Sequence, residues 1–364
     1  MLTFLSFILV IGIIIFVHEL GHFLAAKSVG IRVETFSLGY PPKMFSRRRG
    51  ETEYAIGWIP LGGYVKMSGM IDESLQGGEA LTGAPWEFAS KKTWQKMWVI
   101  SAGVIMNLLL GVLLYTGISV IKGIPEPSSQ AVVGELTPGW PADEAGLLPG
   151  DRIVAVAGEP IENWDDLLAA VHPRAEVETE IVVARVEQEE RFTLTPKAIE
   201  TTIDGESTTI GQIGIGPEVV FRPGSAGEIL LSGVYATTNI VTLVAGNIWK
   251  LVTLQVSIRD LGGPIMIAKL SGDSARKGIV HLLSFIGFIS VNIGCFNLLP
   301  IPALDGGHLL ILSGEALIRR EMPVRARMAV QQAGMLLLLA LVVLIVVNDA
   351  QRIFGFEWLR SIFH

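Results

Sequence analysis

Hydrophobic residues in this chain are gathered into long blocks that polar stretches separate. The blocks occupy Leu2–Val17 and then about 98–121, 226–256, 278–299 and 331–348. A helix needs roughly 20 mainly apolar residues to cross the hydrocarbon core of a bilayer. The pattern predicts membrane-spanning helices at about 4–25, 98–121, 278–299 and 331–348. Hydropathy alone leaves the position of the remaining block undecided.

The composition agrees with a protein that uses lipid as part of its solvent. Half of the 364 residues are hydrophobic and 17% are charged, whereas about a quarter of the residues in soluble proteins carry charge. The net charge of -7 at pH 7 argues against nucleic acid as a partner, because phosphate binding needs a basic surface. Cys295 is the one cysteine, so no internal disulfide is expected.

Positive charge in the loops sets the expected orientation. Lys and Arg recur through 27–96 and again over Arg319–Arg327. Loops rich in Lys and Arg stay in the cytoplasm, so both are expected there and 122–220 is expected outside. A cleaved signal peptide is the alternative for the first block, but no positively charged segment precedes that block.

The segment from 122 to 220 has the pattern of a small β-rich domain. Apolar and polar residues alternate over Arg152–Val156 and Ile181–Val186, with turn residues between such runs. The stretch Asp165–Val171 is typical of a short helix. The length of the segment suits a single domain.

The first apolar block contains the clearest chemistry. His18 and His22 are four residues apart, so on a helix they lie on one face, where two imidazole nitrogens can bind one metal ion. Glu19 lies beside that face, as the general base does in the H-E-x-x-H pattern. A charged residue within a membrane helix costs roughly 2.5 to 3.5 kcal/mol. A functional metal site accounts for that cost better than a surface helix that carries the pentapeptide by chance.

Two histidines leave one protein ligand to be found. Asp305 is the foremost carboxylate, because it follows an apolar block that Pro300 and Pro302 interrupt. A broken helix exposes backbone polar groups, which lipid does not tolerate unless the break lines a cavity. Two alternatives stay open from the residues alone: Asp305 caps the helix that follows, or His308 is the ligand.

Four motifs occur in one order along nearly the whole chain. They are His18–His22, Ile59–Met67, Gly262–Pro264 and Asn297–Gly307. Together they resemble the site-2 protease family of intramembrane zinc metalloproteases, and within it the bacterial regulator of sigma-E protease group. The resemblance implies that His18, His22 and Asp305 hold Zn2+ and that Glu19 activates the attacking water. Two histidines and one carboxylate also favour zinc over other divalent ions.

The resemblance further implies where substrate binds. In the family, the segment that matches Gly62, Gly63, Tyr64 and Val65 dips into the membrane as a β-hairpin, whose edge can pair with an extended substrate strand. Alternation from residue 54 to residue 59 and a tight turn at the two glycines agree with such a hairpin at about 52–68. An ordinary cytoplasmic hairpin is the alternative.

A second group of residues matches family positions that hold substrate backbone near the metal. These residues are Asn297, Pro300 and Pro302. Their alternative role is to break the helix.

The external segment resembles a PDZ domain. The matching residues are Pro141-Ala142, Ala145–Ile153 and Val156–Gly158, and Gln212–Ile215 resembles the groove strand of a permuted PDZ domain. A peptide would add to that strand by β-augmentation, or the domain would exclude bulky ectodomains by size, which is the role we favour.

Two departures from the family pattern bear on function and geometry. Sigma-E type relatives commonly carry two PDZ domains, and this chain has room for one, which puts an identical substrate in doubt. Val104 stands where relatives usually have Pro after the residue that matches Gly103, whereas Asn107 is kept. The second departure concerns only local helix geometry.

The assigned ligands determine the expected path of the chain. The spans that end near His22 and Asp305 must both run inward to bring these residues to one depth. A further crossing at 226–256 would place Asp305 on the wrong side, so an interfacial or partly inserted helix is expected there. We therefore expect an α-helical polytopic membrane protein with four spans and a membrane-dipping β-hairpin. Its parts are membrane segments at 1–121 and 278–364, an extracytoplasmic PDZ domain at 122–220, and an interfacial helix region at 221–277.

These expectations describe an intramembrane zinc metalloendopeptidase. It would cleave transmembrane segments of single-pass membrane proteins, either anti-sigma factors or remnant signal peptides, near the cytoplasmic face of the bacterial inner membrane. The PDZ domain and both termini would lie outside, and the expected partners are the substrates, the lipid bilayer, and a peptide or ectodomain at the PDZ domain. A membrane scaffold with a vestigial metal site is the alternative, in which Glu19 would be dispensable. A metal transporter would need polar residues in the second and fourth spans, which offer almost none.

Overall fold

The fold of the chain is given by a computed structural model. The structure describes residues 1–70, 82–186, 188–203, 206–253, 255, 262–320 and 322–354. The chain divides into two compact units. The first, here called the helical unit, comprises Met1–Ser119 and Gly227–His364, and the second, here called the β-rich unit, comprises Val120–Ala226.

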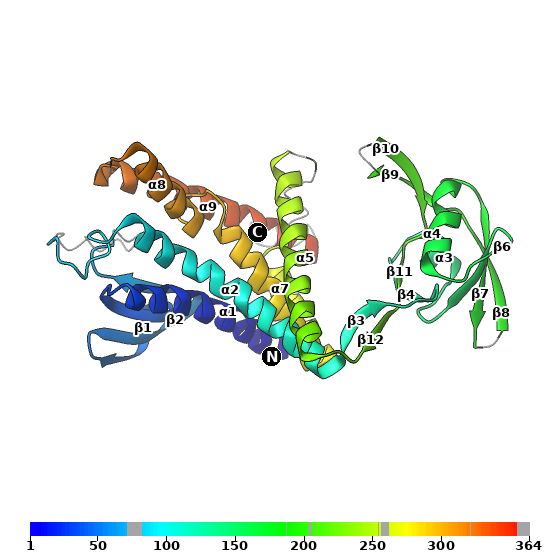
Figure 1. Cartoon of the computed structure of the whole chain (residues 1–364), viewed down its shortest axis with the longest axis horizontal. Helices are drawn as coiled ribbons and strands as arrows, with labels where there is room; N and C mark the ends of the chain where they lie inside the picture. Colours follow the sequence, from blue (N-terminus) through cyan, green and yellow to red (C-terminus); the bar gives the residue numbers. More distant parts are fainter. Residues whose placement is uncertain are drawn as a thin grey trace, which may run out of the picture. The chain divides into compact units, whose positions relative to one another are not determined.

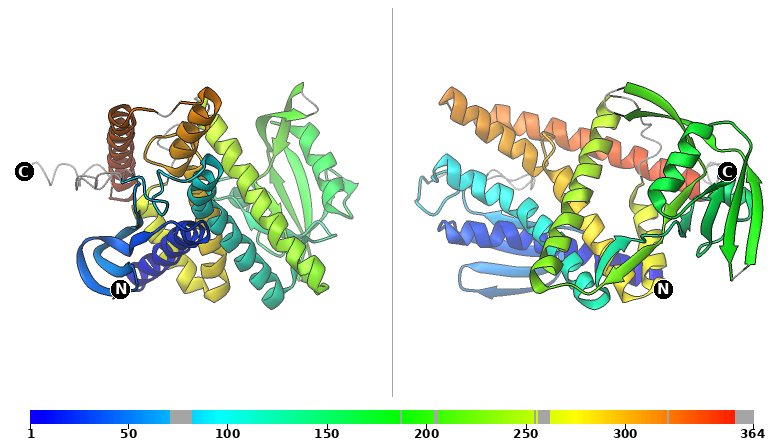
Figure 2. Two further views of the ribbon diagram at one scale, coloured as in Figure 1. Left: turned by 60° about the vertical axis from the view of Figure 1, so that its left-hand side comes forward. Right: turned by 45° about the vertical axis from the view of Figure 1, so that its right-hand side comes forward.

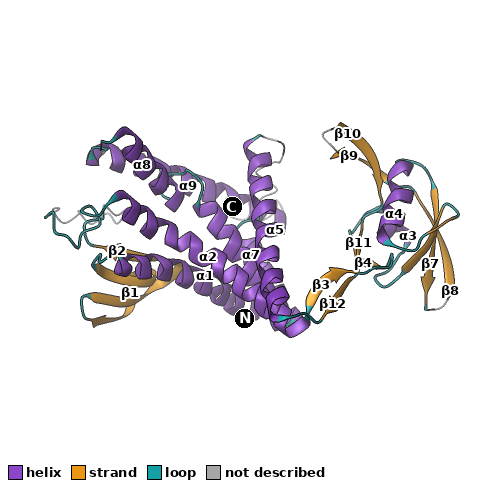
Figure 3. Ribbon diagram, viewed as in Figure 1, coloured by secondary structure: helices purple, strands orange, loops and turns teal. Residues whose placement is uncertain are grey.

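Long helices dominate the helical unit (Figure 1 and Figure 3). The helices are α1 (Leu2–Ser28), α2 (Thr93–Lys122), α5 (Ala226–Val252), α6 (Pro264–Lys277), α7 (Ile279–Asn297), α8 (Asp305–Ile318) and α9 (Val324–Phe354). In the described part of the chain, five of them are long and apolar enough to cross a membrane, namely α1, α2, α5, α7 and α9. This number of apolar helices makes the chain a multi-pass membrane protein.

Helix α5 occupies the block whose position hydropathy left undecided. It is one uninterrupted helix of 27 residues, and it satisfies the length and apolarity needed for a span. The expected count of four spans is therefore not confirmed. Helix α5 crosses α2 steeply (Figure 1 and Figure 2), and Ser232 in α5 donates a hydrogen bond to Ser119 in α2 at 2.8 Å.

The helical unit packs its apolar side chains in two buried clusters. One joins α1 to α7 through Val10, Ile14, Leu282, Ile286 and Ile289. The other surrounds the end of α1 and includes residues of α2, α8 and the neighbouring sheet. Association of helices in lipid depends on such close van der Waals packing, because lipid tails are as apolar as the side chains themselves. The two clusters hold α1 between α2, α7 and the start of α8.

A sheet lies against α1 at the end that carries the histidines. Its strands are β1 (Val33–Arg49) and β2 (Thr52–Met67), which pair antiparallel with several register shifts. Phe36 in β1 is paired with both Tyr54 and Val65 of β2, and Phe45 is paired with Ile56. The two bent strands therefore behave as four segments in the order 43–49, 53–57, 33–38 and 63–67.

This arrangement corrects the expected hairpin. The predicted tight turn at Gly62 and Gly63 is wrong, because both glycines lie within the continuous strand β2. The segments 53–57 and 63–67 do not pair with each other, since residues 33–38 lie between them. Pairing between segments distant in sequence decides strand order, and alternation within one segment cannot reveal it. The correction leaves 63–67 at an edge of the sheet.

The β-rich unit has its own hydrophobic core, formed by residues that include Val133, Ile153, Leu167, Ile181 and Val183. Its elements are β3 (Ile124–Pro127), β4 (Val133–Leu136), α3 (Pro141–Ala145), β5 (Arg152–Val156), β6 (Glu159–Pro160), α4 (Trp164–Val171), η1 (His172–Arg174), β7 (Thr179–Arg185), β8 (Gln188–Leu194), β9 (Lys197–Ile203), β10 (Glu206–Gln212), β11 (Ile215–Pro217) and β12 (Val219–Arg222). Four of the strands form a sheet in the order β6-β5-β7-β8. The expected strands and short helix are thus observed as β5, β7 and α4.

Candidate metal centre

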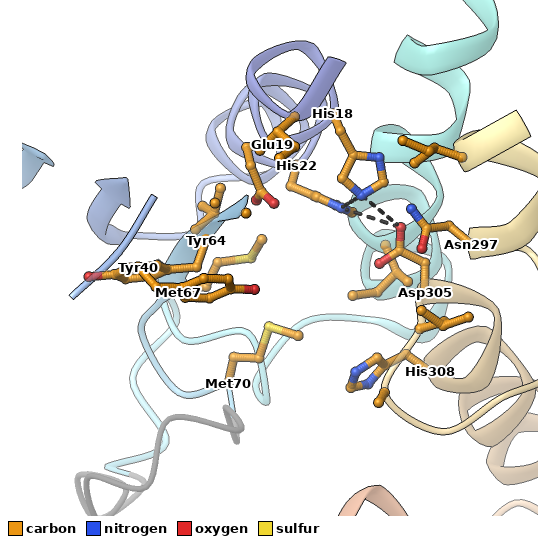
Figure 4. Close-up of a pocket in the computed structure, with 18 of the residues that line it drawn as sticks. His18, Glu19, His22, Tyr40, Tyr64, Met67, Met70, Asn297, Asp305 and His308 are labelled. Atoms are coloured by element: carbon orange, nitrogen blue, oxygen red, sulfur yellow. Dashed lines mark hydrogen bonds and ion pairs between the residues drawn. The ribbon is translucent and has the colours of Figure 1, made fainter. Parts of the chain in front are cut away.

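Helix α1 presents two imidazoles on one face, as the four-residue spacing predicts. The Nε2 atoms of His18 and His22 lie 3.3 Å apart, and His22 is buried. Both atoms face the carboxylate of Asp305, with Oδ2 at 3.3 Å from His18 Nε2 and 3.4 Å from His22 Nε2 (Figure 4). In the described part of the chain this is the one group of three or more His, Cys, Asp or Glu residues with metal-binding geometry.

A loop between α7 and α8 delivers Asp305 to this position. Asp305 is the first residue of α8, where the helix N-terminus favours a negative charge. A Cβ atom on Gly306 would lie 2.3 Å from the carbonyl oxygens of Leu298 and Leu299, so only glycine lets the loop fold back onto the first turn of α8. Ala303 in the same loop has φ 94°, a strained conformation of the kind that collects at functional sites.

The three ligand atoms fit a zinc ion. Tetrahedral coordination with bonds of about 2.0 to 2.1 Å places ligand atoms about 3.3 to 3.4 Å apart, and the three observed separations are 3.3, 3.3 and 3.4 Å. Asp305 Oδ2 is buried and has no hydrogen-bond partner among the described residues. His22 Nδ1 lies 2.8 Å from the carbonyl oxygen of Val99, which can only accept, so the lone pair of His22 is on Nε2 and points at the centre. Converging lone pairs and a buried carboxylate oxygen without a donor call for a cation.

A cavity of about 480 Å³ opens beside the three ligands. Residues of α1, β1, β2, α2, α7, α8 and α9 line it. Tyr40, Tyr64, Met67 and Met70 form the wall opposite Asp305 (Figure 4), and the rings of Tyr40 and Tyr64 are stacked with 6.5 Å between their centroids. The cavity is large enough to receive a stretch of polypeptide next to the ligands.

Glu19 lies between the histidines and the edge of the sheet. Its carboxylate points into the cavity (Figure 4). A Cβ atom on Gly63 would approach Glu19 Cγ to 2.9 Å, so the backbone of segment 63–67 passes directly beside Glu19. A strand paired with that segment would run through the cavity, past both Glu19 and the ligands.

The predicted substrate-binding residues are placed unequally. Gly62, Gly63, Tyr64 and Val65 all line the cavity, as does Asn297, which lies beside Asp305 (Figure 4). The two prolines are not among the cavity-lining residues that the structure describes. Pro302 packs against α9, where a Cβ atom on Gly334 would lie 2.0 Å from the Pro302 carbonyl oxygen.

Two histidines outside the group are placed away from the ligand atoms. His308 lines the cavity one turn along α8 from Asp305 (Figure 4), and its Nδ1 is 3.5 Å from Nε2 of Gln331. His172 belongs to the β-rich unit. Sequence reasoning missed Tyr40, Met70 and the Val99 carbonyl, because only the pairing of β1 with β2 and the packing of α2 on α1 bring them to the site.

Most of the chain matches a known family. A model of peptidase family M50 matches residues 6–341. The chain belongs to peptidase family M50. The expected resemblance to the site-2 proteases is thereby confirmed.

Several M50 relatives are similar over nearly their whole length. The regulator of sigma-W protease RasP of Bacillus subtilis is 30% identical, covering 97% of this chain and 99% of the relative. A putative zinc metalloprotease of Agrobacterium fabrum is 33% identical over 96% of each chain. A putative zinc metalloprotease of Campylobacter jejuni is 34% identical, covering 97% of this chain and 95% of the relative. This member of family M50 is therefore a metalloprotease, and it is related to enzymes that are named zinc metalloproteases.

Proposed function

We propose that this protein is a zinc endopeptidase that hydrolyses peptide bonds within the membrane-spanning segments of other proteins. The observation that carries the proposal is one cavity inside an apolar helical unit, which brings together three ligand atoms, a carboxylate beside them and an open strand edge. Ionisable side chains within an apolar helical unit carry a free-energy cost, so their convergence on one cavity indicates function.

His18, His22 and Asp305 are the zinc ligands in this proposal. Zinc supplies Lewis acidity and lowers the pKa of a water molecule to about 7. Glu19 accepts the proton of the attacking water and passes it to the leaving amine nitrogen, which requires a carboxylate that reaches the cavity. Helix α8 holds Asp305 at its first residue, so the ligand keeps its position during turnover.

Substrate enters as an extended strand along residues 63–67. A membrane helix hides its amides in internal hydrogen bonds, so hydrolysis requires local unwinding. The free edge of the sheet supplies replacement backbone partners, and Asn297 on the other side of the cavity offers an amide to the same chain. Pro300 and Pro302 shape the loop that carries Asp305 and keep Asn297 next to it. The energy of these contacts offsets part of the cost of unwinding.

The substrates are single-pass membrane proteins cut near the cytoplasmic face of a bacterial inner membrane. The relative from Bacillus subtilis is named regulator of sigma-W protease RasP, which supports an anti-sigma factor as substrate, with remnant signal peptides as the other class. The positive loops 27–96 and Arg319–Arg327 support a cytoplasmic active site and an extracytoplasmic β-rich unit, with both termini outside. Four spans with α5 at the interface fit this topology, and the steep crossing of α5 over α2 supports it.

The β-rich unit serves as a PDZ domain that gates substrate access. A cavity of about 260 Å³ lies between α4 and residues 211–215, with Trp140, Trp164 and Leu168 in its wall. Its place beside the groove strand suits an apolar peptide. Exclusion of bulky ectodomains by size is the role we assign to the unit as a whole.

The test is cleavage of a single-pass substrate with a shortened outer domain, in membranes that hold the native chain, Glu19→Gln or Asp305→Ala. Both variants are expected to lose cleavage, with zinc retained in Glu19→Gln and lost in Asp305→Ala. Zinc content is measured on the purified proteins. Continued cleavage by Glu19→Gln would contradict the proposal and favour a membrane scaffold.

A further inference from the structure

One face of α2 lies directly against both histidines. Val99, Gly103 and Asn107 follow each other at four-residue spacing, so they share that face. A Cβ atom on Gly103 would lie 2.4 Å from His22 Nε2 and 2.7 Å from His18 Cε1. The absence of a side chain at Gly103 lets the backbone of α2 approach both rings, which brings Val99 to one ring and Asn107 to the other.

Val99 determines which nitrogen of His22 is protonated. The distance from His22 Nδ1 to the Val99 carbonyl oxygen is 2.8 Å. A carbonyl oxygen only accepts hydrogen bonds, so Nδ1 carries the proton and Nε2 keeps its lone pair for a metal. A backbone carbonyl in this position is a common partner of metal-binding histidines.

Asn107 stands in the equivalent place at His18. Its side-chain amide nitrogen is 3.2 Å from His18 Nδ1, and the residue is completely buried. Its carbonyl oxygen Oδ1 is buried and has no hydrogen-bond partner among the described residues. A nitrogen donor opposite Nδ1 requires the His18 tautomer with its proton on Nε2, the atom that faces Asp305, and that tautomer cannot bind a metal through Nε2.

A half-turn of the Asn107 amide resolves this conflict. The oxygen and nitrogen of an amide occupy nearly equivalent positions, and the hydrogen-bond network decides their assignment. With Oδ1 turned towards His18, the buried oxygen gains a donor and Nδ1 carries the proton. Nε2 of His18 then presents its lone pair beside Nε2 of His22.

We infer that Asn107 is a positioning residue of the metal centre, whose side-chain oxygen accepts the Nδ1 proton of His18 and so directs Nε2 to the zinc ion. Together with Val99 at His22, it makes one face of α2 responsible for the tautomer of both histidine ligands. The inference rests on the proposed role of His18 as a zinc ligand. It assigns to Asn107 a function beyond helix packing, because packing requires no particular polar atom.

Substitutions at Asn107 distinguish a side chain that accepts a hydrogen bond from one that only fills space. Asn107→Leu and Asn107→Ala both remove the acceptor but leave different volumes, and both are expected to weaken zinc binding about 10- to 100-fold, the usual effect of losing such a partner. Asn107→Asp keeps an oxygen acceptor and is expected to bind zinc within about threefold of the native chain. Asn292→Leu is the matched control, since Asn292 in α7 donates to the Phe288 carbonyl within its own helix.

Zinc affinity is measured on the purified full-length protein by competition with a chromogenic chelator, and thermal unfolding without zinc reports the integrity of each variant. Native affinity in Asn107→Leu and Asn107→Ala would overturn the inference, and so would an equal loss in Asn107→Asp. The His18→Ala variant separates the two proposals. Retention of zinc by His18→Ala contradicts the ligand assignment itself, whereas its loss together with native affinity in Asn107→Leu contradicts only the role of Asn107.

The tautomer of His18 can also be measured directly in the native protein, so this test does not depend on whether an Asn107 variant folds. Nitrogen-15 NMR of histidine-labelled, zinc-loaded native protein distinguishes protonated from unprotonated ring nitrogens. We expect Nδ1 protonated and Nε2 metal-bound for both His18 and His22. An unprotonated Nδ1 on His18 would overturn the inference.

Discussion

Buried carboxylates are satisfied differently in the β-rich unit and at the metal centre of the helical unit. In the β-rich unit, Asp151 is 2% exposed and forms an ion pair with Arg185 at 2.6 Å. It also accepts a hydrogen bond from the Leu148 amide at 2.8 Å. In the helical unit, Oδ2 of Asp305 is buried without a hydrogen-bond partner among the described residues. A carboxylate with its donors in place is explained by structure alone, whereas a buried oxygen without a donor needs another explanation, which the proposed metal ion supplies.

Asp349 shows that the helical unit can satisfy a buried carboxylate when function does not require otherwise. This residue of α9 is 1% exposed. It accepts hydrogen bonds from the backbone amides of Gly263, Ile265 and Met266, at 3.0 to 3.1 Å, at the start of α6. The difference between Asp349 and Asp305 therefore comes from their partners and not from the unit in which they lie.

The largest effect is expected where α2 touches the metal centre. Gly103→Ala would place a methyl group 2.4 Å from His22 Nε2, which displaces the ring, so we expect zinc content and cleavage to fall at least about 10-fold. Gly117→Ala on the same helix is the control, because a Cβ atom there meets nothing within 4 Å. Metal analysis and substrate cleavage measure both. Equal zinc content in the two variants would show that the His22 ring can accommodate a methyl group at position 103 without losing the metal.

Removal of Asp151 should be the most costly change in the β-rich unit. Asp151→Ala removes the buried carboxylate that pairs with Arg185 and accepts from the Leu148 amide, so we expect a larger loss of stability than the loss of an exposed pair would cause. Glu180→Ala is the control, since Glu180 pairs with the exposed Arg191 at 3.4 Å and such a pair contributes less than about 1 kcal/mol. Hydrogen exchange of strands β5 and β7 in the full chain reports both losses. Similar exchange in the two variants would contradict a structural role for Asp151.

A smaller loss is expected for the carboxylate that caps α6. Asp349→Ala removes the acceptor of three backbone amides, and loss of a helix cap costs about 2 kcal/mol at the upper end. The control is Asp273→Ala in the same helix, where an exposed pair with Arg276 is lost. Thermal unfolding of the full chain in detergent distinguishes them. If Asp273→Ala lowered the unfolding temperature more than Asp349→Ala, a structural role for Asp349 would be contradicted.

Among these predictions, acidification should have the smallest effect on the β-rich unit. Burial raises the pKa of Asp151, but hydrogen bonds from Arg185 and the Leu148 amide, with the charge of Arg185, outweigh it and leave the pKa below its usual range. The stability that Asp151 contributes is therefore present above the unfolded-state pKa of about 3.9 and is lost as pH falls through the folded-state pKa. Exchange of β5 is expected to rise below about pH 4 in the native chain. The same rise in Asp151→Asn would assign the pH dependence to other groups.

Much of the site followed from short-range patterns. The spacing of His18 and His22 predicted one helical face, and the structure places both imidazoles on it. The interrupted block before Asp305 predicted a cavity, and Asp305 lines one. Such features depend on a few neighbouring residues, so periodicity and helix-breaking residues reveal them. Membership of the protease family was confirmed by comparison.

The predictions that were wrong or were not confirmed concern contacts between distant segments. The turn expected at Gly62 and Gly63 was wrong because residues 33–38 insert between the two halves of β2. The count of four spans is not confirmed, since α5 is long and apolar enough to cross as well. Alternation and hydropathy describe one segment at a time, whereas strand order and helix orientation depend on the free energy of packing against other segments.

Local amino-acid pattern thus determined the apolar helices, the two histidines with Glu19 between them, and the family of the protein. Only the folded chain decided which atoms complete the centre. It turned His22 Nδ1 towards the Val99 carbonyl and buried Asn107 beside His18. It also left Asp305 Oδ2 facing both rings. The reason is physical: helix periodicity acts over a few residues, while this centre requires α1, α2 and α8 to converge within a few ångströms, which depends on close packing between distant segments.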